Sequence, residues 1–194
     1  MAKIPPDAFK KVTAATGHGN SRPFERAGGY ISRIDEVRHH DKRNGTFAIC
    51  VDKTILKVLH KTPADELDGK HEVFRGHEVG EQVTDFIDFD KDYAPDAVAS
   101  FLGRLFGVDP AEVTAEDTST AVDEGQPCRG FIVETQNAAR QVRNDESKWY
   151  ARISYERVIP ASDLAGILDA KGLEALGGED KLAEMIEAET SDEE

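Results

Sequence analysis

One helical stripe interrupts a chain whose other apolar runs have the pattern of β-strands. Apolar side chains recur in it at i, i+3, i+4, i+7 and i+8, the spacing of one face of an α-helix. The stripe consists of Val98, Phe101, Leu102, Leu105 and Phe106. Pro95 suits the first turn of such a helix and Gly107 its end. We therefore predict a helix over residues 95–106.

Three runs before this helix and two after it are rich in β-branched and aromatic residues, which favour strands. The predicted strands cover residues 30–37, 46–59, 77–89, 130–136 and 148–159. A polar turn ending in Asn44-Gly45 joins the first two strands, and a polar loop over residues 137–147 joins the last two. The polar pair Asp52-Lys53 favours a bulge in the second strand. A short second helix is expected over residues 109–116, followed by a polar connection over 118–126.

Three strands, a helix and two more strands follow one another in the order of an OB-fold, a small five-stranded Greek-key barrel. The predicted fold class is therefore mainly β, a five-stranded OB-fold barrel with one main α-helix. Three parts are expected: a basic flexible arm (1–28), an OB-fold-like nucleic-acid-binding domain (29–160) and an acidic, partly helical C-terminal tail (161–194).

Charge is distributed unevenly along the chain, whose formal net charge is −14. Residues 1–43 contain nine basic and five acidic side chains, whereas residues 161–194 contain eleven acidic side chains and two lysines. The segment 128–160 contains six basic and four acidic side chains, so it is locally basic within an acidic protein. The whole-chain charge is therefore a poor guide to what the folded part binds.

Basic clusters coincide with the two loops that, together with the face of strands two and three, bind oligonucleotides in OB-folds. We therefore expect both clusters on one surface, with basic side chains on phosphates and aromatic rings on bases. The predicted nucleic-acid-binding residues are Arg38, Lys42, Arg43, Phe47, Lys57, Arg140, Arg143, Lys148, Tyr150 and Arg152. Alternation places Trp149 and Tyr155 on one face with Ile153, which favours the core for Trp149, and Tyr150 with Arg152 on the other. Whether Trp149 and Tyr155 belong to the core or to the binding face stays open.

Segments that resemble metal-binding motifs lack residues that these motifs require. The segments starting at His71 and His77 resemble HExxH, but Arg75 and Glu81 replace the second histidine. A calcium loop starting at Asp88 would need glycine where Tyr93 stands. Cys50 and Cys128 are far apart and are expected to be buried free thiols. We therefore predict no catalytic residues, no metal and no cofactor, and a protein that is not an enzyme.

Neither a signal peptide nor a membrane-spanning run is visible in the sequence. The N-terminus lacks the apolar run of a signal peptide, and the longest uninterrupted apolar run, residues 47–51, is far too short to cross a bilayer. The sequence therefore favours a reducing cytoplasm and gives no sign of a membrane partner.

The element order over residues 28–160 and the acidic segment 161–194 resemble phage-encoded single-stranded-DNA-binding proteins of the OB-fold type. This resemblance implies nonspecific single-stranded DNA binding in phage DNA replication or recombination, in the host cytoplasm. It also implies an acidic tail that competes with DNA for the basic surface and binds replication or recombination proteins. Such tails commonly end in an aromatic residue, whereas this chain ends in Asp192-Glu193-Glu194. The stripe Leu182, Met185 and Ile186 is the remaining candidate for partner binding.

Two other functions agree with the sequence. In an acidic adaptor or inhibitor of a nucleic-acid enzyme, the active surface would consist of two acidic parts, residues 44–160 and residues 161–194, each with a net charge of −9. A virion structural component is the third hypothesis. The oligomeric state, monomer or dimer, and the preference for DNA or RNA stay open.

Overall fold

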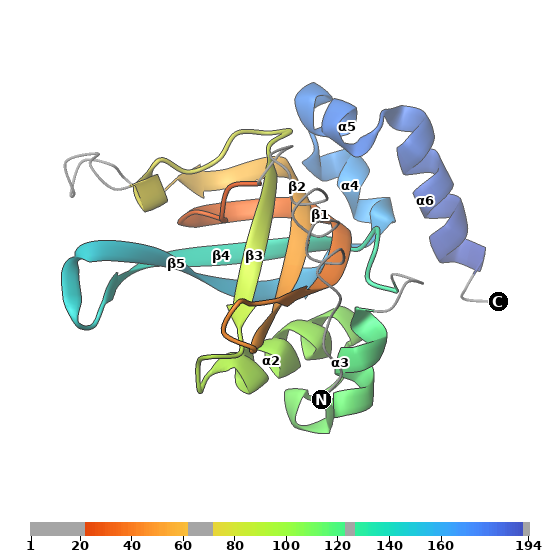
Figure 1. The fold of residues 1–194 in the computed structure, drawn as a ribbon. Helices are drawn as coiled ribbons and strands as arrows, with labels where there is room; N and C mark the ends of the chain where they lie inside the picture. The colour runs from red at the N-terminus through yellow and green to blue at the C-terminus, as the bar shows by residue number, and fades with distance from the viewer. Residues whose placement is uncertain (1–21, 62–71, 123–126, 192–194) are drawn as a thin grey trace, which may run out of the picture.

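The fold is mainly β: five antiparallel strands form one sheet in the order β3-β2-β1-β4-β5 (Figure 1). The computed structural model describes residues 22–61, 72–122 and 127–191. The strands are β1 (Gly28–Asp41), β2 (Phe47–Lys61), β3 (Gln82–Asp88), β4 (Ile132–Val142) and β5 (Asp145–Val158). All five predicted strands are present, and the arrangement is compatible with a barrel-like fold. No helix among the described residues is long and apolar enough to cross a membrane.

The predicted central helix is confirmed as α2 (Ala94–Phe106). A proline stands in its first turn, and Gly107 ends it with φ of 68°, a left-handed conformation that glycine adopts without strain. After α2 come a short 3-10 helix, η3 (Pro110–Glu112), and α3 (Ala115–Ala121). The expected polar connection over 118–126 is therefore wrong at its start. Thr114 and Asp117 form a reciprocal capping box that begins α3.

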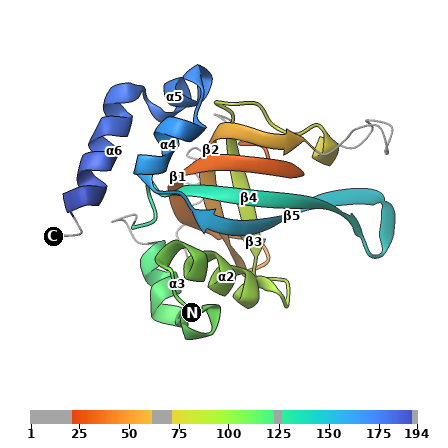
Figure 2. The same ribbon diagram turned by 180° about the vertical axis from the view of Figure 1, so that it is seen from behind.

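Two apolar clusters lie on opposite faces of the sheet. Alternation along β2 sends Ile49 and Val51 to one face, where α2 covers them with Phe101 and Leu102. Leu56 points to the other face, where it packs with residues of β1, β4 and the C-terminal helices. Figures 1 and 2 show α2 and α3 along one side of the sheet and α4, α5 and α6 beside another.

The C-terminal segment is part of the folded molecule and forms three helices, α4 (Ala161–Ile167), α5 (Ala170–Leu176) and α6 (Glu179–Ser191). Leu164, Leu176 and Leu182 are buried against the sheet. The Glu189 carboxylate accepts hydrogen bonds from the backbone of Ala161 and Ser162, 3.1 and 3.2 Å away, at the start of α4. The segment predicted as a partly helical tail is therefore largely helical, and α6 continues as far as Ser191.

The last two strands are longer than predicted and form a hairpin that extends beyond the rest of the sheet (Figure 1). The expected loop over residues 137–147 is wrong: β4 runs to Val142 and β5 begins at Asp145. Polar side chains concealed these strands, since they occupy the exposed face. The opposite face carries Trp149, whose ring lies 5.3 Å from that of Phe74 in η2 (Glu72–Phe74).

Smaller differences concern strand ends and irregularities. The third strand begins at Gln82, so residues 77–81, expected in it, lie outside. The bulge expected at Asp52-Lys53 lies on the neighbouring strand, because Asp35 of β1 is the residue without a partner opposite this pair. The structure describes the arm from Arg22 onward, and residues 1–21 lie outside the described residues.

The two edge strands, β3 and β5, do not pair with each other in the described sheet. Residues 23–25 run parallel to β3 and pair with it, because Thr84 N–H donates to Pro23 O and Glu25 N–H to Thr84 O, each at 3.0 Å. Glu25 points inward and forms an ion pair with Lys53, and neither side chain is exposed. The N-terminal segment thus covers the free edge of β3.

A buried polar network completes this region. The Tyr155 hydroxyl donates to Asp85 at 2.9 Å and lies 3.2 Å from Lys53 Nζ. Thr135 and Asn137 of β4 donate to the Glu25 carboxylate at 3.0 and 2.8 Å. Side chains from β2, β3, β4 and β5 therefore meet at the N-terminal segment.

Candidate nucleic-acid interface

Three of the predicted binding residues lie together on the outer face of the β4–β5 hairpin. Arg140 is directly opposite Tyr150, and Arg152 is opposite Ala138, two positions along the same face. All three side chains are exposed, with 45% of Tyr150 accessible to solvent. No ion pair among the described residues involves Arg140 or Arg152. Two guanidinium groups that form no ion pair with any described residue therefore flank an exposed aromatic ring.

The tip of the hairpin adds two further predicted residues. Arg143 is exposed in the two-residue turn between the strands. Lys148 Nζ lies 2.8 Å from the Asp145 carboxylate, and this ammonium, together with Ser147, lowers the pKa of Asp145 to about 2. Residues 137–152 contain four basic and two acidic side chains, so the distal hairpin is basic.

The basic residues of the β1–β2 turn lie elsewhere. The hairpin tip extends past Gly28, whereas this turn follows Asp41, so the two clusters expected on one surface lie at opposite ends of β1. Lys42 Nζ is held by Asp88, at 2.7 Å, and by Asp90. These carboxylates raise the pKa of Lys42, and Arg43 remains exposed beside it. Because its charge is already paired, Lys42 is a weaker phosphate ligand than the hairpin arginines.

Two further predicted residues, Phe47 and Lys57, make contacts within the protein that explain their positions. The Phe47 ring stacks on Phe89, with centroids 4.2 Å apart, and His39 lies 5.0 Å away on another side. Lys57 Nζ donates to the Ile167 carbonyl, 2.5 Å away, at the last residue of α4. Lys57 thus satisfies a carbonyl that the helix leaves unpaired at its C-terminus.

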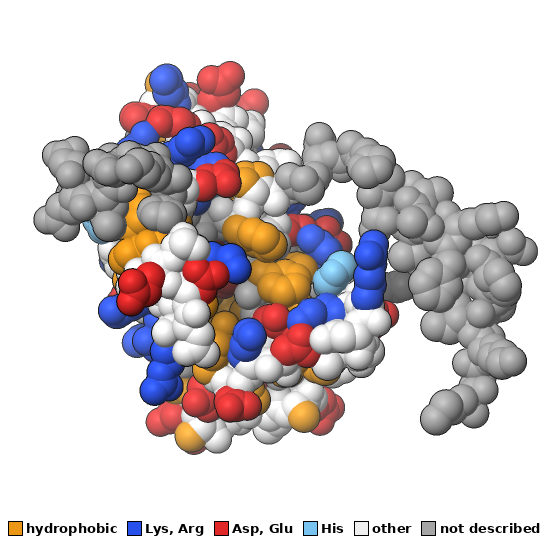
Figure 3. Space-filling model, turned by 60° about the vertical axis from the view of Figure 1, so that its left-hand side comes forward, with side chains coloured by type: hydrophobic (Ala, Val, Ile, Leu, Met, Phe, Trp, Pro, Cys, Tyr) orange, Lys and Arg blue, Asp and Glu red, His pale blue; other side chains and the backbone are white. Residues whose placement is uncertain are grey.

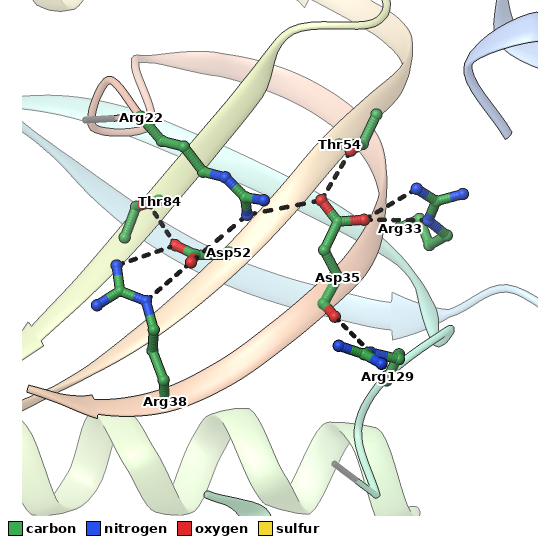
Figure 4. Close-up of polar contacts among 8 residues, drawn as sticks. All are labelled: Arg22, Arg33, Asp35, Arg38, Asp52, Thr54, Thr84 and Arg129. Atoms are coloured by element: carbon green, nitrogen blue, oxygen red, sulfur yellow. Dashed lines mark hydrogen bonds and ion pairs between the residues drawn. The ribbon is translucent and has the colours of Figure 1, made fainter. Parts of the chain in front are cut away.

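Arg38 belongs to an arginine–aspartate network on the outer face of β1, β2 and β3 (Figure 4). Its Nε donates to the Asp52 carboxylate at 2.9 Å, and this hydrogen bond raises the pKa of Arg38. Thr84 also donates to Asp52, at 2.5 Å, and Arg22 lies 3.5 Å from the same carboxylate. The Arg38 guanidinium is therefore held in place while 38% of its side chain stays exposed.

Asp35 is the second acidic centre of this network (Figure 4). Its carboxylate accepts hydrogen bonds from Arg33 at 3.0 Å and from Thr54 at 2.8 Å, and lies 3.6 Å from Arg22. Arg129 donates to the Asp35 backbone carbonyl at 2.9 Å. Four arginines therefore surround two aspartates, and with Glu36, whose charge also acts on Arg38, the group keeps a small excess of positive charge.

Three aromatic side chains beside this network, Phe24, Phe86 and His40, were not predicted as binding residues. Phe86 gives a signal in the sequence, because it alternates with Val83 and Ile87 and so lies on the opposite, outer face. Phe24 gives none, since its segment has too few apolar residues to indicate a strand. Figure 3 shows hydrophobic side chains at the centre of one face of the molecule, with lysines, arginines, a histidine and carboxylates around them.

The described residues give no support to a metal site or to a reactive cysteine. Within the described residues, no group of three or more His, Cys, Asp or Glu side chains could hold a metal ion. Both cysteines are buried, as predicted, and burial raises the pKa of each thiol to about 11, so neither is a reactive thiolate. Comparison of the sequence with protein-family models and with curated proteins finds no match.

Proposed function

We propose that this protein binds single-stranded DNA without sequence specificity, in DNA replication or recombination. The observation that carries the proposal is the outer face of the β4–β5 hairpin, where Arg140 and Arg152 flank Tyr150. Unpaired arginines attract phosphates at any sequence, and an exposed tyrosine ring stacks on any base. The arrangement therefore favours a flexible single strand, whose bases can turn toward the ring.

The fold supports the same proposal. The strand order β3-β2-β1-β4-β5 is the order of an OB-fold barrel opened between its third and fifth strands. In this protein the N-terminal segment and the Tyr155–Asp85 hydrogen bond occupy that opening. We therefore propose an OB-fold in which an added N-terminal segment lies along the edge of β3.

The described C-terminal helices give little support to the two roles predicted for the acidic tail, competition with DNA and partner binding. In Figures 1 and 2 the helices α4, α5 and α6 lie at the end of the molecule away from the hairpin tip. Their acidic side chains are therefore poorly placed to compete with DNA for the hairpin. Residues 192–194, the end of the segment predicted to compete with DNA, lie outside the described residues. Met185 and Ile186 are partly buried against the helical core, so α6 offers little apolar surface to a partner.

Fluorescence anisotropy with labelled oligonucleotides tests the proposal. We expect a thymine oligonucleotide to bind more tightly than a duplex of the same length. Replacing Arg140 and Arg152 with alanine should weaken binding to thymine and mixed-sequence single strands alike. Lys181→Ala is the matched control, because it removes an exposed positive charge from α6. Absence of binding by the wild-type protein would refute the proposal.

A further inference from the structure

Three aromatic rings stand together on the outer face of the sheet, away from the hairpin tip. Phe86 of β3 is the central ring, with Phe24 centred 5.9 Å from it and His40 centred 6.0 Å from it. Each of the two outer rings is inclined at 65° to the Phe86 plane. Phe24 and His40 are exposed, and Phe86 is half-buried. Together these three rings form what we call the aromatic platform.

The exposure of Phe24 is imposed by the fold. Its neighbours in sequence pair with β3 through two backbone hydrogen bonds of 3.0 Å, and Glu25 points inward to the buried Lys53. Alternation then sends Phe24 outward, where 67% of the residue is accessible to solvent. Phe24 does not stand alone, because its ring adjoins Phe86 and, beyond it, His40, and a contiguous exposed group of rings is typical of a surface that contacts a ligand.

The strands beneath the platform carry two small side chains and Arg38, whose guanidinium group is held in place by Asp52. Cys50 of β2 lies opposite Phe86 on one side and opposite Arg38 on the other, and Ala48 lies opposite His40. Ala48 and Cys50 are buried, so the rings and Arg38 provide the accessible surface here. Arg38 is fixed by Asp52, within the network of four arginines and two aspartates.

We propose that the aromatic platform binds the unpaired bases of single-stranded DNA, with Phe24 as its principal stacking residue. This inference rests on the proposed function and adds a second contact region to the hairpin. The neighbouring excess of arginines favours a polyanion over an apolar peptide, because a base stacked on Phe24 or Phe86 brings its phosphates toward Arg38. Phe24 lies outside the five strands of the barrel, on the segment added to the edge of β3.

Variants of the three rings, titrated with a labelled thymine oligonucleotide, test this inference. Phe24→Ala should weaken binding by about 5- to 150-fold, the range expected when the ring no longer stacks on one base. The dependence of affinity on salt should stay as in the wild type, since no charge is removed. His40→Ala and Phe86→Leu should weaken binding in the same way. Phe106→Ala, which removes an exposed phenylalanine of α2, is the matched control.

An abasic oligonucleotide of the same length separates stacking from other causes. Wild type and Phe24→Ala should bind this backbone equally, because it offers no bases. Thermal unfolding of each variant tests for a loss of fold, and Phe24→Ala keeps the test decisive because its ring is mostly exposed. Equal affinity of wild type, Phe24→Ala and Phe106→Ala for the thymine oligonucleotide would overturn the inference while leaving the proposed function intact. Failure of the wild type to bind would instead remove the proposed function itself.

Discussion

Lys53 and Glu25 form an ion pair whose side chains have no exposed surface. Burying two charged groups costs more free energy than an ion pair at the surface gains. A buried ion pair therefore persists where close geometry and additional hydrogen bonds offset this desolvation cost. Compensation here comes from Thr135 and Asn137, which donate to Glu25, and from the Tyr155 hydroxyl near Lys53. The pair thereby fixes the N-terminal segment against the sheet.

Replacing Lys53 with methionine should leave the Glu25 carboxylate buried without its counter-ion. We expect the free energy of unfolding to fall by about 3–5 kcal/mol, the usual effect of breaking a buried pair. Urea denaturation followed by circular dichroism measures this change. The double variant Glu25→Gln/Lys53→Met should recover part of the stability, since it removes both charges. An unchanged free energy of unfolding in the single variant would contradict the proposed role of the pair.

Acid sensitivity should reveal the Lys42–Asp90 ion pair. Lys42, with Thr46 and Asn44, lowers the pKa of Asp90 from its ordinary 3.8 to about 2. The folded-state pKa lies below the unfolded one, so this ion pair stabilises the protein above about pH 4, and the stabilisation disappears as pH falls toward 2. Melting temperatures of wild type and Asp90→Asn should therefore differ at neutral pH and converge near pH 2. A difference that stays constant over this range would argue against the ion pair.

At the scale of elements, the spacing of apolar residues predicted the segments that pack in the core. It missed strand segments whose side chains face solvent. The α2 stripe was recognisable because it faces the core with few interruptions. The part of the distal hairpin over residues 137–147 was predicted to be a loop, because it carries Arg140, Arg143 and other polar residues. Its strands persist because Arg140 and Gln141 pair with Tyr150 and Trp149 across the hairpin. Local composition does not contain this pairing.

The C-terminal helices should contribute directly to the stability of the sheet. Leu164 has no exposed surface and packs with Ile31, Leu56 and Ile132. Leu164→Ala should lower the free energy of unfolding by about 2–5 kcal/mol, because it removes buried methyl groups and leaves a cavity. Chemical denaturation measures this change, and Ile167→Ala, at a partly buried position of the same helix, should cost less. Equal and negligible changes would mean that α4 is not part of the core.

For the whole molecule, the sequence predicted the fold class better than the site. The sequence predicted the five strands and α2, because each of these elements has its own local spacing of apolar residues. The Glu25–Lys53 pair and the grouping of Phe24 with Phe86 join residues far apart in the chain, and no local pattern predicts such contacts. Of the predicted site residues, Arg140, Tyr150 and Arg152 lie on one face of the hairpin, whereas Lys42 and Lys57 are engaged in contacts within the protein.

Opposite charges lie at opposite ends of the molecule. The distal hairpin is basic, whereas the described part of the C-terminal segment contains eight acidic side chains and two lysines. Figures 1 and 2 place these two regions on different sides of the sheet. A nucleic acid should therefore approach from the hairpin side, because the helical side repels it.

The salt dependence of single-stranded DNA binding tests the central claim most directly. The slope of the logarithm of affinity against the logarithm of salt concentration reports the number of phosphates that the protein neutralises. Replacing Arg140 and Arg152 with alanine should reduce the magnitude of this slope by about 0.7 for each phosphate that is no longer neutralised, whereas Lys181→Ala should leave it as in the wild type. Equal slopes for the wild type and the hairpin variant would contradict the account, because the hairpin would then neutralise no phosphates.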